Sequence, residues 1–157
     1  MSIPALEHPA NLGFCRFREQ WRRGPNVEPP ARPDDVARPY DSLGTHPDLV
    51  ARLWDELGAN LPVDCRYVFC GAPVLMHPTT QVMFAFAGGT HTLALRLPER
   101  EFAAAIEAGA TRVKVYPGRQ PSIDLAKIGP EWVFVEWLKG EQQWCLAAYE
   151  LAGRGTQ

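Results

Sequence analysis

The chain has 157 residues, about the length of one domain, and 46% of them are hydrophobic and 22% charged, which excludes a wholly disordered protein. Its net charge of −2 is unevenly divided: residues 1–39 hold six arginines against five acids, whereas residues 40–157 hold ten basic residues against thirteen acids. The mildly acidic body argues against a large phosphate-binding surface. No apolar run approaches the ~20 residues of a membrane span, and no secretory signal is visible, so we expect a cytoplasmic protein that does not insert into membranes.

The first 39 residues are a proline-rich arm, since they contain seven of the fifteen prolines. Proline interrupts helices and central strands, so residues 24–39 are expected to be an extended connector. Before this connector, aromatic residues at i, i+3 and i+7 (Phe14, Phe17 and Trp21) indicate a short helix with an apolar stripe. The stripe predicts a docking segment that contacts either the body of the protein or a partner.

The body is expected to begin near Tyr40 and to end at residue 152, with residues 153–157 as a tail. Three helices are predicted in it, because apolar residues recur at helical spacing and a glycine follows two of these stretches. The first helix runs from an N-cap at Thr45 to a C-cap at Gly58, the second from Pro98 to Gly109, and the third from Glu141 to Ala152.

Five strands are predicted in the remaining apolar stretches, at residues 66–76, with a bend at 71–73, and at residues 82–87, 91–97, 111–116 and 131–138. In the third of these, Leu93, Leu95 and Leu97 share one face, and Thr92, Ala94 and Arg96 share the other. This order of elements predicts an α+β two-layer sandwich, in which about three helices cover one face of an antiparallel sheet of about five strands. A loop of about fourteen residues, rich in proline and glycine, precedes the last strand, and loops of this length are often functional.

Residues 88–92 (Gly-Gly-Thr-His-Thr) are the most suggestive short motif, because glycines let the backbone approach a ligand and Thr90, His91 and Thr92 offer hydrogen-bonding groups. The motif lacks the lysine of a phosphate-binding loop, and an ordinary hairpin turn explains it as well. His91 is in phase with Leu93, so we expect it on the inner face as a ligand, a base or a structural residue.

Cys70 precedes Gly71 at a bend, where it is either half of a nucleophilic pair with His91 or a small buried hydrophobe. A zinc site built from Cys65, Cys70, His77 and His91 fits by residue type, but the spacing matches no structural zinc pattern. We therefore predict no metal and no other cofactor. None of the four cysteines lies in a CxxC motif, and reduced thiols are expected.

Charged residues of the arm and the long loop give further candidates. Four arginines interleave with the aromatic stripe, at Arg16, Arg18, Arg22 and Arg23. Such a strip binds nucleic acid through phosphate contacts and base stacking, or it serves as a docking arm with solvated arginines. Arg119 is a candidate anion contact in the loop. Glu136 is a functional buried carboxylate if its face points inward, but we expect it on the surface.

The hairpin into residues 93–98, the helix ending at Gly109 and the strand at 132–133 before a final helix resemble the small bacterial domains of the MmcQ/YjbR type and a related group labelled luciferase-like. The resemblance spans about Tyr40 to Leu151. It implies a compact α+β domain without an agreed enzyme activity, sometimes suggested to bind DNA.

The sequence thus favours a non-catalytic binding domain that recognises a protein or a small molecule through an exposed sheet face, the loop around Gly118 and the arm. The arm is also a candidate contact in a homodimer. Ligand contacts are predicted at His91, Thr90, Thr92, Cys70 and Arg119, and partner contacts at Phe14, Phe17, Trp21, Arg22 and Arg23. The alternatives are a small enzyme or a metal- or ligand-binding protein that uses His91 and Cys70, and a nucleic-acid-binding protein that uses the arm.

Overall fold

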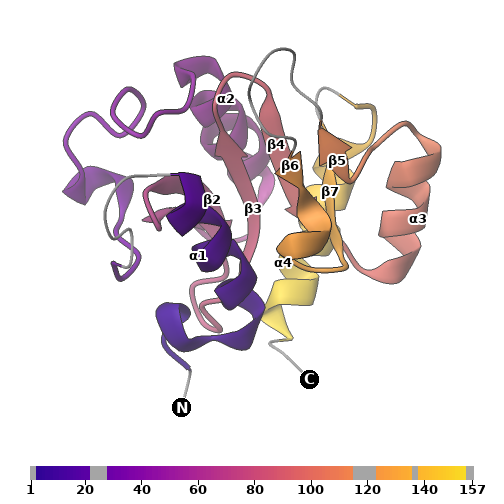
Figure 1. The fold of residues 1–157 in the computed structure, drawn as a ribbon, viewed down its shortest axis with the longest axis horizontal. Coiled ribbons are helices and arrows are strands. Elements are labelled where there is room, and N and C mark those ends of the chain that lie inside the picture. Colours follow the sequence, from indigo (N-terminus) through magenta and orange to yellow (C-terminus); the bar gives the residue numbers. More distant parts are fainter. Residues whose placement is uncertain (1–2, 22–27, 115–122, 136–137, 155–157) are drawn as a thin grey trace.

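The computed structural model describes residues 3–21, 28–114, 123–135 and 138–154. Its centre is an open antiparallel sheet with the strand order β1-β2-β3-β4-β7, and helices pack against it, so the predicted α+β class is confirmed (Figure 1). The five strands are β1 (Arg66–Phe69), β2 (Ala72–Met76), β3 (Met83–Gly88), β4 (Thr92–Arg96) and β7 (Trp132–Phe134). A separate ribbon pairs β5 (Val113–Lys114) with β6 (Ile123–Asp124). Among the described helices, none combines the length and apolar character needed to cross a bilayer.

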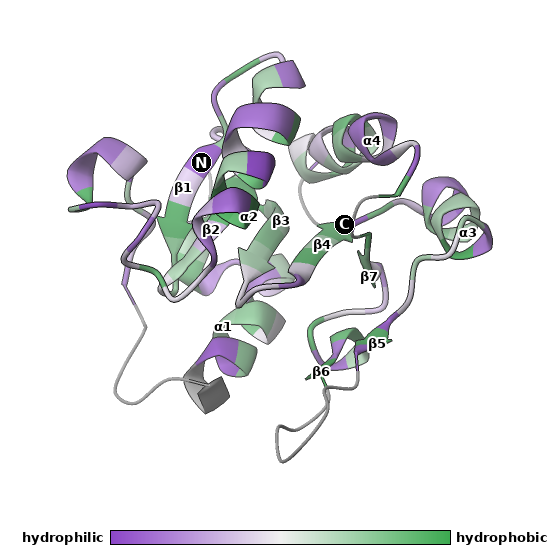
Figure 2. Cartoon of the chain, turned by 90° about the horizontal axis from the view of Figure 1, so that it is seen from above, coloured by the Kyte–Doolittle hydropathy of each residue, from purple (hydrophilic) through white to green (hydrophobic). Residues whose placement is uncertain are grey.

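Helical segments cover both faces of the sheet. The first, α1 (Pro9–Trp21), packs on what we call the α1 face, and the last, α4 (Glu141–Gly153), packs on the opposite α4 face (Figure 2). The α4 face also carries a continuous stretch whose hydrogen bonding changes from α to π to 3₁₀: α2 (Pro47–Ala51), η3 (Arg52–Leu57) and η4 (Gly58–Asn60). The remaining helical segments are α3 (Glu99–Glu107), which packs beside β7 and α4, and the 3₁₀ turns η1 (Ala5–Glu7), η2 (Pro33–Asp35) and η5 (Leu125–Lys127).

The core of the α4 face follows from side-chain alternation along the strands. Leu93 and Leu95 of β4 point to this face and are fully buried. The helices contribute Trp54 and Trp144 to the same cluster. The indole N–H of Trp54 donates to the carbonyl oxygen of Val74 at 3.0 Å, so its one polar group is paired inside the core.

The α1 face is covered by the N-terminal arm, so the arm and the sheet share one core. Phe14 is fully buried with its ring centroid 4.8 Å from that of Phe86, and the ring of Phe17 lies 6.3 Å from the same ring. A glycine allows this close approach, since a Cβ on Gly13 would lie 2.2 Å from the carbonyl oxygen of Ile128. The structure thus shows a helix in the arm, and it shows the body as the docking surface of the two that the sequence left open.

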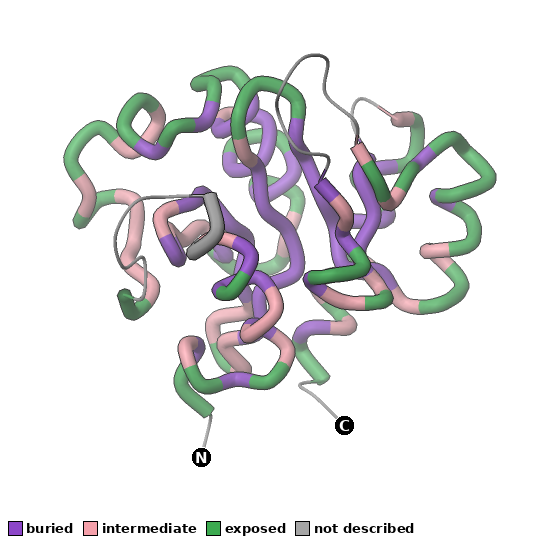
Figure 3. The backbone as a smooth tube through the Cα atoms, viewed as in Figure 1, coloured by how far each residue is buried: buried purple, intermediate pink, exposed green. Residues whose placement is uncertain are grey.

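This arrangement corrects the expectation of an exposed sheet face. Every residue of β2, β4 and β7 is buried, and the central strands run through the interior (Figure 3). The arm adds a helix to the second face of the predicted two-layer body. The sequence showed that the arm has an apolar stripe, but not which surface the stripe would cover.

Of the strand predicted at 111–116, the described part contains β5, which pairs with β6 and not with a strand of the main sheet. β7 lies beside β4 instead, with Leu95 paired to Val133. A single bridge joins Thr111 to Phe134. We attribute the difference to burial, because β7 is buried along its whole length, whereas Val113 in β5 is exposed.

The N-cap of the first helix of the body lies one residue later than predicted. His46 is the N-cap, and its Nδ1 accepts a hydrogen bond from the backbone N–H of Asp48 at 3.1 Å. Thr45 instead bridges to Gly89 at the end of β3, which ties this helix to the sheet. The helical stretch continues to Asn60 as a 3₁₀ turn that begins at Gly58.

Candidate functional site

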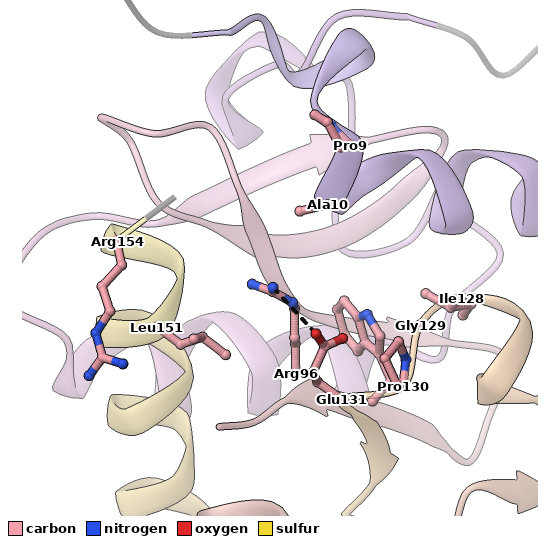
Figure 4. A pocket seen from close by; sticks show the side chains of 10 residues that line it. Pro9, Ala10, Arg96, Ile128, Gly129, Pro130, Glu131, Leu151 and Arg154 are labelled. Carbon is pink, nitrogen blue, oxygen red and sulfur yellow. Dashed lines mark ion pairs between the residues drawn. The ribbon is translucent and has the colours of Figure 1, made fainter. Parts of the chain in front are cut away.

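A cavity of about 560 Å³ lies where α1 begins, β4 and α4 end and the chain enters β7 (Figure 4). Ligand pockets in proteins commonly have volumes of roughly 300–1,000 Å³, so its size suits a small molecule. The cavity is lined by Pro9, Ala10, Arg96, Ile128, Gly129, Pro130, Glu131, Trp132, Leu151 and Arg154. Four separate stretches of the chain thus build one site.

Arg96 is the charged residue buried deepest in this cavity. The alternation that places Leu95 in the core of the α4 face places Arg96 on the α1 face, opposite Trp132 of β7. Its side chain is only 10% exposed. Burial lowers the pKa of the guanidinium, and the nearby carboxylate of Glu131 opposes this effect. Arginine nevertheless stays protonated in proteins, so the site contains a buried positive charge.

The hydrogen-bonding capacity of Arg96 is incompletely used. Its Nη2 lies 3.8 Å from Oε1 of Glu131, which is an ion pair but is too long for a hydrogen bond. Its Nη1 is buried and has no hydrogen-bond partner among the described residues. A buried donor left unpaired costs about 1–3 kcal/mol. The guanidinium therefore keeps unused donor capacity at the wall of the cavity.

The other walls are mostly apolar, with Trp132, Ile128 and Leu151 contributing side chains. Arg154 lies at the rim, at the end of α4, and Figure 4 shows Leu151 between it and Arg96. Two arginines against one glutamate give the lining a net positive charge. The cavity thus combines a fixed cation with an apolar surface.

His8 lies close to this positive charge, just before α1 begins. It is 3% exposed, and its Nδ1 accepts a hydrogen bond from the backbone N–H of Ala10 at 3.2 Å. Burial and the charge of Arg96 both lower the pKa of His8. The imidazole is therefore held neutral at pH 7, and its pKa is sensitive to the charge in the cavity.

The motif at residues 88–92 forms the turn between β3 and β4. Thr90 and His91 are exposed in the turn and Thr92 is buried at the start of β4. The expectation that His91 points inward is wrong, because β4 begins only at the following residue. The carbonyl oxygen of His91 accepts a hydrogen bond from Lys114, whose pKa is lowered to about 8 by burial. Ligand binding by this turn stays a prediction.

Cys70 does not lie in the same environment as His91. It is buried on the α1 face, where its Sγ lies 3.0 Å from that of Cys15. Cys65 belongs to the core of the α4 face, on the other side of the sheet. Within the described residues, no three His, Cys, Asp or Glu side chains form a group that could hold a metal ion.

Phe14 and Phe17 of the arm face the chain's own sheet, which corrects their assignment as partner contacts. Phe14 and Phe17 are both buried there. The guanidinium of Arg18 donates to the carbonyl oxygens of Cys70 and Gly71, at 3.2 and 3.1 Å, so this arginine anchors the arm as well. Four further predictions concern residues outside the described part of the chain: Arg22, Arg23, Arg119 and Glu136. The same holds for the side chain of Trp21.

Arg96 was not predicted as a site residue from the sequence, although the alternation along its strand predicted the correct face. A charged residue within an apolar strand, on the same face as Ala94, was the available signal. One face of the sheet was expected to be exposed, because the docking position of the arm was unknown. Glu131 and Trp132 were missed for the same reason, since only the tertiary structure brings them to Arg96.

No protein-family model, curated protein or solved structure matches this chain significantly. The resemblance to MmcQ/YjbR-type domains therefore stays a prediction. The fold and the cavity are the basis for inferring what the chain does.

Proposed function

We propose that this chain is a non-catalytic binding domain that takes up a small organic anion in the cavity around Arg96. The observation that carries the proposal is the buried guanidinium with Nη1 unpaired among the described residues, at the wall of a cavity of ligand size. An anionic group would pair this donor, and the apolar part of the ligand would contact the remaining walls.

The chemistry of Arg96 favours a carboxylate or phosphate as the anionic group. The planar guanidinium presents parallel N–H groups that match two oxygens of one anion. Hydrogen bonds between charged groups are about twice as strong as neutral ones, more so where water is excluded. Among these anions we favour a carboxylate with an apolar body, because Trp132 and Leu151 offer apolar surface beside the charge.

Binding is favoured over catalysis by the composition of the lining. Its titratable side chains are Arg96, Glu131 and Arg154, which offer no nucleophile activated by a neighbouring base. The enzyme alternative with His91 and Cys70 is weaker, because one side chain is exposed in a turn and the other is buried beside Cys15.

Nucleic-acid binding through the arm also has less support. Phe14 and Phe17 would have to leave the core before they could stack on bases. Of the four arginines that interleave with the aromatic stripe, the structure describes Arg16, which is exposed, and Arg18, which donates to backbone carbonyls of the turn between β1 and β2.

The proposal is tested by titrating the full chain with benzoate, isovalerate and inorganic phosphate, with thermal shift and calorimetry as readouts. We expect saturable binding of a carboxylate, weakened roughly 10- to 100-fold in Arg96→Gln, because a hydrogen bond to a charged group contributes about 1.5–3 kcal/mol. The control Arg100→Gln removes the same charge from an exposed position on α3 and should bind as the unaltered chain does.

Each outcome of this titration decides between the candidate functions. Equal affinity in Arg96→Gln and Arg100→Gln would contradict the proposal, as would the absence of binding by all three probes at millimolar concentration. Tighter binding of phosphate than of either carboxylate would keep the site and correct the ligand class. A circular dichroism spectrum of each variant separates lost binding from lost folding.

A further inference from the structure

Cys15 and Cys70 bring two thiols together from distant parts of the sequence. Cys15 lies in the middle of α1, and Cys70 lies in the two-residue turn between β1 and β2, 55 positions later. Their Sγ atoms are 3.0 Å apart, and the structure holds both as buried thiols. A disulfide bond has an S–S distance of about 2 Å, so a shift of about 1 Å would allow the sulfurs to bond.

The backbone conformation at Cys70 is one that cysteine rarely adopts. Phe69 pairs with Ala72, and the two residues between them have positive φ, 51° at Cys70 and 73° at Gly71. A two-residue turn with positive φ at both positions strongly favours asparagine, aspartate or glycine at the first. Cysteine is strained there, so turn formation does not explain it. The turn does, however, direct Sγ toward α1.

The approach of the two thiols is fixed on the α1 side as well. Arg18, three residues after Cys15, donates hydrogen bonds to the carbonyl oxygens of both turn residues, Cys70 and Gly71. Phe14, just before Cys15, is fully buried against Phe69 and Phe86. The contacts of Phe14 and Arg18, on either side of Cys15, therefore fix the position of α1 relative to the turn that contains Cys70.

We propose that Cys15 and Cys70 are a redox modification site, at which a small hydroperoxide forms a disulfide that ties the arm to the sheet. In the first step one thiol is oxidised to a sulfenic acid, and the peroxide O–O bond breaks to release water or an alcohol. In the second step the other sulfur attacks the sulfenic sulfur, and a water molecule leaves with the thiol proton. The two thiols together lose two electrons and two protons, which the peroxide takes up.

This inference goes beyond the proposed anion site and does not depend on it. The two are nevertheless physically linked, because α1 also supplies Pro9 and Ala10 to the cavity. A disulfide at Cys15 would hold this wall in place. Failure of one proposal leaves the other standing, since the first is measured by anion binding and the second by cross-linking.

The chain offers an internal control in its other two cysteines. Cys65 and Cys145 are buried on the α4 face, and burial raises the pKa of each thiol to about 12. The thiolate is the reactive form, so these two residues should resist peroxide. The 3.0 Å contact between the sulfurs of Cys15 and Cys70 predicts that this pair forms the cross-link.

The test treats the reduced, folded full chain with hydrogen peroxide and maps the cysteines by mass spectrometry without reduction. An arginine separates each cysteine from the next along the chain, so trypsin places the four on different peptides. We expect a cross-linked peptide pair that contains Cys15 and Cys70, with Cys65 and Cys145 still open to alkylation after denaturation. Sulfinic or sulfonic acids without a cross-link, or a cross-link that involves another pair, would overturn the proposal.

A second measurement asks whether the cross-link stabilises the arm. We expect oxidation to raise the melting temperature on the order of 10 °C in the unaltered chain and in the control Cys65→Ala/Cys145→Ala. Cys70→Asn should keep the fold, because asparagine suits the turn, and should show no such rise. A cross-link with an unchanged melting temperature, or an equal rise in Cys70→Asn, would contradict the proposed tie.

Discussion

The two faces of the sheet each contain a buried arginine, and the two arginines are paired in different ways. On the α4 face, Arg52 of η3 forms a close ion pair with Glu141 at the start of α4, and both side chains are about nine-tenths buried. On the α1 face, Arg96 reaches only to 3.8 Å from Glu131, whose side chain is 39% exposed. The first pair joins two helices, whereas the second borders a cavity. The arginine on the α4 face is neutralised between two helices, whereas the arginine on the α1 face borders the cavity in which we propose that an anion binds.

The largest change in the free energy of unfolding is expected when the ion pair between Arg52 and Glu141 on the α4 face is broken. Glu141→Gln would leave Arg52 as a buried charge without its close carboxylate partner, and breaking such a pair typically costs about 3–5 kcal/mol. The free energy of unfolding in urea measures this loss. Glu150→Gln removes an exposed carboxylate from the same helix and should change it by less than about 0.5 kcal/mol. Similar values for the two variants would remove the structural role assigned to the pair.

Gly13→Ala tests how closely the arm approaches the α1 face. Alanine normally stabilises a helix relative to glycine by roughly 0.5–1 kcal/mol. Here the added Cβ would meet the backbone oxygen of Ile128, which cannot turn away as a side chain can. We expect a net loss of about 1–3 kcal/mol in urea unfolding. An increase in stability would show that α1 docks less closely than described.

Arg96→Met should raise the free energy of unfolding, whereas Glu141→Gln should lower it. Methionine fills much of the volume of arginine without a charge that needs partners, and such replacements of buried ionic groups are often neutral or stabilising. We expect the unliganded domain to gain up to about 1 kcal/mol while anion binding is lost. A destabilisation as large as that of Glu141→Gln would mean that both arginines are structural.

The smallest expected effect is the contribution of His8 to the decrease in the free energy of unfolding at acidic pH. Its pKa in the folded state is below the ordinary value of 6.5, so the unfolded chain binds more protons as the pH falls. The free energy of unfolding should therefore decrease as the pH falls below 6.5, until the lowered pKa of the folded state is passed. His8→Gln should reduce the slope of the free energy of unfolding against pH. The slope that remains should include a contribution from His77, because burial also lowers the pKa of His77. An unchanged slope in His8→Gln would contradict the placement of His8 beside Arg96.

Local patterns were enough to predict much of the fold. The glycine turn between β3 and β4, the leucine alternation of β4 and the apolar face of α1 with Phe14 and Phe17 appear as expected. These features depend on residues a few positions apart, so they can be recognised without knowledge of the rest of the chain. The pairing of β7 with β4 depends instead on which segment buries more apolar surface, and it was not predicted.

The candidate site could not be predicted in the same way. Arg96 and Pro9 are far apart in the sequence, yet both line the cavity. Cys15 and Cys70 likewise meet only because Phe14 docks against Phe86. No short-range pattern encodes such contacts, since they depend on how α1 packs across the sheet.

The sequence by itself determined the α+β composition, the positions of most helices and strands, and the face of β4 on which Arg96 lies. Only the tertiary structure decided that this face is covered, that Arg96 is buried beside a cavity and that two cysteines meet under the arm. The physical reason is that propensity and alternation act within one element. Burial arises between elements, and it is burial that gives an arginine or a thiol an environment different from water.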